Sequence, residues 1–202
     1  MCMVNLSARE KLINTLYGLL IACPIIAYFT VHWQNRLNAP QADDFVDVLW
    51  FFEIFLSRTS WLEKIDAITL PIHEHISVIN HLTFLTHYAF FQQVNFFHYT
   101  MIGHGIVLLC CFTLARWLKP SIGWLPGMAI AVLVYLNLHY WDSMAWAITA
   151  IANQIVILFA LLAALSFHQN PQRILLPLLW ALAACLSQFN GLIVLFALCF
   201  SS

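Results

Sequence analysis

Charged residues are scarce in this chain. Lys, Arg, Asp and Glu make up 8% of its 202 residues, whereas about 25% is usual in a globular domain, so an ordinary soluble domain is excluded. A disordered segment is excluded as well, because 62% of the residues are hydrophobic and 15% are aromatic. Eight basic residues against nine acidic ones leave no basic surface for the phosphates of a nucleic acid. We therefore expect no nucleic-acid partner.

Signatures of several soluble classes are also missing. The sequence has no Gly-rich phosphate loop, no GxSxG elbow and no HExxH motif. Its six cysteines fall in apolar segments or at the extreme N-terminus, which is not the distribution of a disulfide framework. The medium that suits such a chain is lipid, and membrane lipid is its first expected partner.

Long apolar runs are what the chain has instead. A run of about 20 apolar residues forms a helix that crosses the bilayer core, which is roughly 30 Å thick. We predict spans at 12–31, 94–118, 122–138, 144–167 and 174–200, the last with a polar break at 187–191. The break makes the last run either two half-spans or a short span followed by the start of another. The sequence thus predicts an all-α integral membrane protein, a single membrane domain over 1–202 with about five to six transmembrane helices.

Basic residues predict how these spans are oriented. Five of them flank the spans and fall on one side if the spans alternate: Arg9, Lys11, Arg116, Lys119 and Arg173. The positive-inside rule places that side and the N-terminus in the cytoplasm, and the long loop 32–93 outside. This outer loop holds seven of the nine acidic residues. We expect it to carry the function at the outer face of a membrane, the bacterial inner membrane being the predicted location.

The first half of the outer loop combines acidic and apolar residues. Between Asp43 and Leu56 this mixture predicts an amphipathic helix lying in the membrane interface. The adjacent Asp43 and Asp44 allow two interpretations. They can cap a helix by accepting backbone N–H groups, or they can act as a carboxylate pair, as general base or metal ligand.

Histidines mark the second half of the loop, between Pro71 and Gln92. At about 100° per residue, one helical face collects polar and aromatic side chains, namely His73, Ser77, Asn80, Phe84, His87 and Phe91. Such imidazoles can bind metal, bind phosphate or relay protons; alternatively, the face meets water at the membrane surface. His104, deep in the second span, can be functional or can hydrogen-bond to a neighbouring helix.

The arrangement resembles the N-terminal part of the GT-C superfamily of membrane glycosyltransferases, which includes protein O-mannosyltransferases, aminoarabinose transferases of lipid A and oligosaccharyltransferases. Shared features are a first span, an Asp pair early in a long outer loop, an interfacial helix and a second amphipathic helix leading into the next span. Two short segments resemble those of bacterial GT-C-like proteins, an Asn-Glu-His-Arg segment of the outer loop and a polar opening of the fourth span. They are His73-Glu74-His75 and Asn153-Gln154.

The resemblance implies transfer of a sugar from a polyprenyl-phosphate donor at the outer face. It implies that Asp44 or Asp43 is the catalytic carboxylate, and that Glu74, His75 and His73 lie where the phosphate of the lipid-linked sugar donor binds. A divalent cation is the one cofactor that it suggests, with Asp43, Asp44 and His75 as candidate ligands.

Two departures from the GT-C pattern modify this expectation. Ile76 stands where the bacterial segment has Arg, which removes a bidentate phosphate contact. The chain also has about five spans where these enzymes have seven or more. We therefore expect a shortened, N-terminal version of such an enzyme, or one that another membrane subunit completes.

Two other functions fit the sequence. His98, His104 and His139 are candidate ligands of a haem or a transition metal in a membrane protein. Alternatively, the chain is a non-catalytic subunit of a larger membrane complex. The polar break at 187–191 favours the subunit, because polar groups at membrane depth need protein neighbours.

Overall fold

A computed structural model describes residues 7–71 and 77–201, and over these residues the chain is all-helical, as the sequence predicts. Three of the described helices are long and apolar enough to cross a membrane: α1 (Ala8–Gln34), α5 (Phe96–Ile122) and α8 (Ala147–Gln169). Three shorter apolar helices accompany them: α6 (Trp124–Tyr135), α9 (Leu175–Ser187) and α10 (Leu192–Ser201). This set of helices is compatible with an integral membrane protein.

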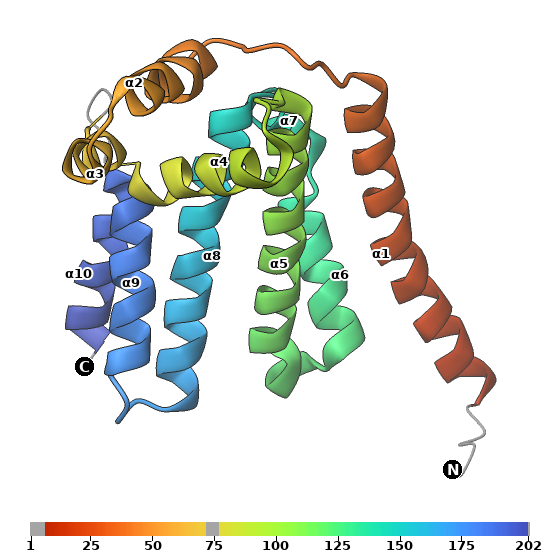
Figure 1. Cartoon of the computed structure of the whole chain (residues 1–202). Helices are drawn as coiled ribbons and strands as arrows, with labels where there is room; N and C mark the ends of the chain where they lie inside the picture. Colours follow the sequence, from red (N-terminus) through yellow and green to blue (C-terminus); the bar gives the residue numbers. More distant parts are fainter. Residues whose placement is uncertain (1–6, 72–76, 202) are drawn as a thin grey trace.

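The apolar helices form an up-and-down bundle (Figure 1). The turns that join α5 to α6 and α8 to α9 lie at the end where α1 begins. We call this end the basic end, because all five basic residues that flank the apolar segments belong to it: Arg9, Lys11, Arg116, Lys119 and Arg173. The opposite end, formed by residues 35–71, 77–95 and 136–146, is called the loop end.

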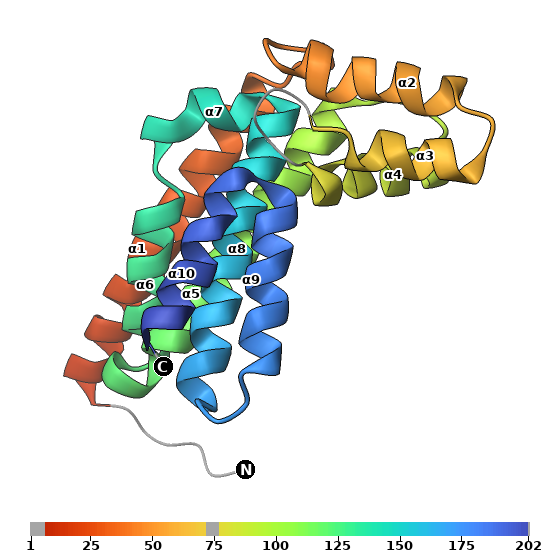
Figure 2. The ribbon, with the colours of Figure 1, turned by 90° about the vertical axis from the view of Figure 1, so that its left-hand side faces the viewer.

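Short helices cover the loop end. The π-helix η1 (Phe45–Trp50) continues into α2 (Phe51–Ser57), and α3 (Trp61–Thr69) begins at a capping box between Ser60 and Glu63. The next helix, α4 (Val78–Phe91), lies across the end of the bundle, and with α2 and α3 it projects to one side (Figures 1 and 2). Between α6 and α8, η2 (Leu138–Tyr140) and α7 (Trp141–Ala145) complete this end.

Two boundaries differ from the expected spans. We expected the second span to end at 118 and the third to follow Pro120, but α5 continues through Pro120 to Ile122. A proline this close to the end of a helix disturbs only the last turn. The third run forms a helix of only 12 residues, about 18 Å long at 1.5 Å per residue, which is shorter than the bilayer core. Length therefore supports three complete spans, and five to six crossings remain a prediction.

The polar break lies where the sequence places it. Helix α9 ends at Ser187, the 3-10 helix η3 (Phe189–Gly191) turns the chain, and α10 returns along α9 (Figures 1 and 2). Gly191 permits the turn, because a Cβ at this position would lie 2.2 Å from the backbone of Ala184. The segment is thus a pair of short antiparallel helices, and which of the two expected membrane arrangements it takes remains a prediction.

Two buried clusters hold the bundle together. One joins the loop-end helices to α5 and α8, and includes Phe84 and Ile151. The other lies among α1, α5, α6 and α8, and includes Tyr28 and Val132. Many large apolar side chains point outward instead, which agrees with a lipid-facing surface.

Candidate functional site

Asp44 connects the loop to the start of α8. It is 1% exposed, and its Oδ1 accepts a hydrogen bond from the Ile148 backbone N–H at 2.8 Å. Its Oδ2 accepts from the backbone N–H groups of Ala147 at 3.2 Å and Gln41 at 3.1 Å. The first N–H groups of a helix have no partner inside the helix, and they favour a negative charge. Asp44 therefore caps α8 from a position more than 100 residues earlier in the chain.

These contacts are those of the capping interpretation, but the capped helix is α8 and not the one that follows Pro40. Burial raises the pKa of Asp44 above its ordinary value, and the hydrogen bonds from Ile148, Gln41 and Ala147 oppose this rise. Since both carboxylate oxygens already accept N–H groups, Asp44 offers little free capacity to hold a metal.

Asp43 has a different environment from its neighbour. Its side chain is exposed. The preceding Ala42 adopts a φ of 42°, a conformation uncommon outside glycine, at the turn that leads into the acidic pair. The pair is thus divided into one carboxylate fixed on α8 and one open to the surroundings.

A cavity of about 460 Å³ lies among α1, α6, α7 and α8. Its polar lining residues are all uncharged: Tyr28, Tyr135, Asn137, Ser143, Asn153 and Gln154. Asn153 and Gln154 follow the first residue of α8 by six and seven positions, which places them about 10 Å along the helix from the Asp44 cap. The cavity and the acidic pair therefore lie on the same end of α8.

Gln154 contributes an unused acceptor to this region. Its amide nitrogen donates to the Met144 sulfur at 3.5 Å, whereas its Oε1 is buried and has no hydrogen-bond partner among the described residues. Leaving a buried acceptor unpaired costs about 1–3 kcal/mol. A hydroxyl or amide donor of a bound molecule would remove that cost.

Tyr28, which lines the cavity, is paired with a histidine of α5. The Tyr28 hydroxyl and His104 Nδ1 lie 3.0 Å apart, and the ring centroids of His104 and His32 are 4.3 Å apart. All three side chains are buried. Of the two roles expected for His104, the hydrogen bond to a neighbouring helix is the one observed, and it fixes Tyr28 at the cavity.

The polar face of α4 is turned inward. Asn80 Nδ2 donates to the Ser187 carbonyl at 2.9 Å, and His81 Nδ1 contacts the Ile68 carbonyl at 2.8 Å. Both side chains are fully buried, whereas Phe90 is 80% exposed. The alternative in which this face meets water is therefore wrong for the described residues. The polar groups tie α4 to α9 and α3, whereas the apolar groups are divided between the core, where Phe84 lies, and the outer surface, where Phe90 lies.

His87 and His98 pair at the other end of α4. His87 Nε2 and His98 Nδ1 are 3.0 Å apart, and the ring of Phe91 stacks on His87 with centroids 4.6 Å apart. Burial, and then the nearby His98, lower the pKa of His87. Burial likewise lowers the pKa of His81. The lowered pKa values of His81 and His87 disfavour the charged imidazolium that would bind a phosphate, and both side chains instead link helices.

The remaining sequence candidates that the structure describes do not gather into one site. His73, Glu74 and His75 lie outside the described residues. His98 pairs with His87, whereas His104 pairs with Tyr28, so the structure gives these two candidate haem ligands separate partners. His139 lies in η2. Within 7–71 and 77–201, no group of three or more His, Cys, Asp or Glu residues could hold a metal ion.

Sequence reasoning missed Tyr28 and the polar residues contributed by the α6–α7 segment. Tyr28 is one aromatic residue in an apolar span, but it precedes His32 by four positions, and such residues share a helical face. That spacing was the available signal. Asn137 and Ser143 carry no comparable signal, because only the packing of α7 brings them to the cavity.

Comparison with protein-family models, with curated proteins and with solved structures found no match to this chain.

Proposed function

We propose that this chain is a GT-C-like membrane glycosyltransferase, or the N-terminal part of one, that uses a polyprenyl-phosphate sugar. The observation that carries the proposal is the acidic pair at the start of α8. Two hydrogen bonds from α8 fix Asp44 there, and the same helix supplies Asn153 and Gln154 to the uncharged cavity. The loop end then faces outside, and the basic end faces the cytoplasm.

The two aspartates have separate roles in this proposal. Asp44 positions the loop on α8, and the exposed Asp43 accepts the proton of the acceptor hydroxyl. The acceptor oxygen forms a bond to the anomeric carbon of the sugar while the bond from that carbon to the phosphate oxygen breaks. The lipid phosphate leaves with the electrons of that bond.

A divalent cation fits this region only in part. Asp43 is the open carboxylate of the pair, because the oxygens of Asp44 accept backbone N–H groups. Magnesium is often held by one or two carboxylates together with substrate phosphates. Asp43 can therefore hold such an ion jointly with the donor phosphate, where the ion would supply charge neutralisation of the leaving group.

The cavity suits the sugar better than the phosphate. Its neutral amide, hydroxyl and phenol groups match the hydroxyl groups of a hexose, and the absence of a cationic residue among its lining side chains disfavours a phosphate there. The donor phosphate is assigned instead to the segment of Glu74, His75 and His73, as the GT-C resemblance implies.

The test compares single substitutions of the two aspartates. Membranes containing the wild type, Asp43→Asn or Asp44→Asn are given radiolabelled polyprenyl-phosphate glucose, mannose or aminoarabinose, and loss of label from the lipid phase is measured. We expect Asp43→Asn to reduce transfer by about 100-fold or more without lowering the melting temperature, because the exposed side chain has no role in packing. Asp44→Asn should lower the melting temperature.

Either of two results would overturn the proposal. One is transfer at the wild-type rate by Asp43→Asn. The other is the absence of transfer from all three donors by wild-type chain that melts cooperatively.

A further inference from the structure

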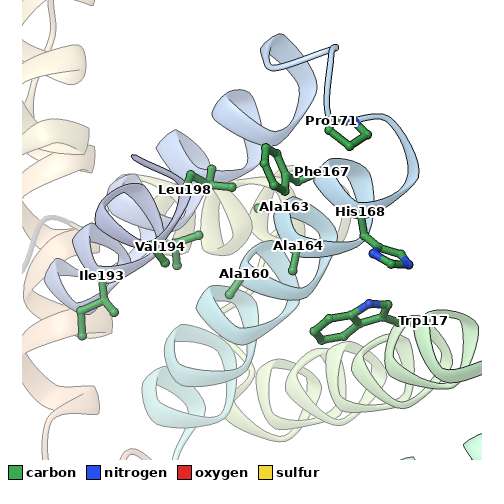
Figure 3. A pocket seen from close by; sticks show the side chains of 11 residues that line it. Trp117, Ala160, Ala163, Ala164, Phe167, His168, Pro171, Ile193, Val194 and Leu198 are labelled. Atoms are coloured by element: carbon green, nitrogen blue, oxygen red, sulfur yellow. The ribbon is translucent and has the colours of Figure 1, made fainter. Parts of the chain in front are cut away.

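An apolar groove lies on the membrane-facing part of the bundle, between the end of α5 and α10. It has a volume of about 590 Å³, within the range of roughly 300–1,000 Å³ typical of ligand pockets. Alanines of α8 form its floor, with Ala160, Ala163 and Ala164 in place of larger side chains. Figure 3 shows these small residues opposite Val194 of α10. The groove is therefore a long space beside a helix predicted to span the bilayer.

The two ends of the groove differ in chemistry. Ile193 lies at the end nearest the start of α10, whereas Trp117, His168 and Pro171 lie at the opposite end (Figure 3). Trp117 and His168 are the lining residues whose side chains carry N–H donors. A molecule in the groove thus meets apolar side chains along most of its length and hydrogen-bond donors at one end.

That polar end coincides with the basic end of the bundle. Arg116 precedes Trp117 directly, and Arg173 follows Pro171 by two positions. Of the nine acidic residues, Glu10 alone lies in the segments of the basic end, against five basic residues there. The local charge favours an anionic headgroup.

We propose that the groove binds one acyl chain of an anionic phospholipid from the surrounding bilayer, with the lipid phosphate at the end formed by Trp117 and His168. The apolar side chains along the groove contact the acyl chain. The N–H donors of Trp117 and His168 and the positive charge of the basic end bind the anionic headgroup. This lipid site lies on the opposite end from the acidic pair, so it stands independently of the proposed transferase activity.

The experiment measures lipid binding to the purified full chain in detergent by native mass spectrometry. Dioleoyl phosphatidylglycerol is compared with dioleoyl phosphatidylcholine, because the two lipids have the same acyl chains and differ in headgroup charge. We expect one phosphatidylglycerol per chain, bound at least about fivefold more tightly than phosphatidylcholine. Ala164→Trp fills the groove and should abolish this preference. Ala22→Trp, at an exposed site on α1, is the matched control and should retain it.

A second measurement applies if Ala164→Trp does not fold. Phosphatidylglycerol with brominated acyl chains should quench tryptophan fluorescence of the wild type, and Trp117→Phe should remove part of that quenching. Equal binding of the two lipids would overturn the proposal. So would full binding by a folded Ala164→Trp chain, or a dimer that this substitution dissociates, because the groove would then be the contact of a second copy.

Discussion

The two ends of the bundle are held by different interactions. At the loop end, buried polar side chains bond to the backbone of other helices, as Asp44 does with α8 and Asn80 with the last residue of α9. At the basic end, tight turns join the apolar helices, and alanines leave an open groove beside α8. Directional hydrogen bonds fix the geometry of the loop end, whereas the basic end leaves space for lipid.

The difference shows what polar residues do in a chain with so few of them. On α4, Asn80 and His81 are fully buried while Leu82 and Phe90 are 43% and 80% exposed, which reverses the arrangement of a helix on a water-soluble protein. Polar groups at the loop end therefore specify helix contacts, whereas apolar groups are divided between the core, as Phe84 is, and the outer surface.

The sharpest test of this comparison between the two ends is to remove the cap that Asp44 provides for α8. Asp44→Ala leaves the N–H groups of Gln41, Ala147 and Ile148 without their acceptor. We expect a loss of about 3 kcal/mol in the free energy of unfolding, measured by denaturation in detergent. Asp43→Ala is the matched control and should change it by less than about 0.5 kcal/mol, since that side chain is exposed. Equal losses for the two variants would show that Asp44 does not hold the loop end.

The pH dependence of stability tests the same carboxylate. Burial raises the pKa of Asp44, so the folded state binds the proton more tightly than the unfolded state does. Protonated Asp44 therefore adds to the free energy of unfolding. This contribution is fully present below the ordinary aspartate pKa of about 4 and is lost as the pH rises through the raised pKa. Relative to Asp44→Asn, which does not titrate there, the wild type should therefore lose stability as the pH rises above about 4. A rise instead would mean that the backbone hydrogen bonds outweigh burial.

The contact between α5 and α8 gives the next largest effect. A Cβ on Gly103 would lie 2.6 Å from the Ala150 carbonyl oxygen, whereas a Cβ on Gly105 would meet nothing within 4 Å. Gly103→Ala should cost about 2 kcal/mol because the helices must separate. Gly105→Ala, two positions away on the same helix, should cost nothing, since alanine favours a helix more than glycine does. Equal melting temperatures for the two variants would contradict this close packing.

The sequence predicted the class of fold from hydrophobic runs, and it located the break after Ser187. It did not predict that the third run would form only α6, because a helix boundary such as the one before Asn137 depends on how η2 and α7 pack. It also placed the polar face of α4 at one side of a helix without deciding between water and protein. Periodicity shows which residues share a face, but not what covers that face.

The candidate site was predictable in its acidic pair and in the polar residues Asn153 and Gln154. Adjacent aspartates indicate a cap or a catalytic carboxylate, but the capped helix begins more than 100 residues later, and no local pattern connects Asp44 with Ala147. The cavity depends on side chains from four separate helices. Its floor residue Gln154 was visible as a polar residue in an apolar span, whereas Tyr28 required knowledge of how α1 packs.

The smallest expected effect concerns the bond between Tyr28 and His104. Tyr28→Phe removes the hydroxyl that lies 3.0 Å from His104 Nδ1 and should cost about 0.6 kcal/mol, the average for such bonds between membrane helices, with about 1.7 kcal/mol as the upper limit. A double-mutant cycle with His104→Ala isolates the pair from the packing of each ring. A coupling energy of zero would mean that ring packing alone holds α1 against α5. A measurable coupling would show that the hydrogen bond keeps Tyr28 at the cavity wall, so directional bonding would extend from the loop end into a spanning helix.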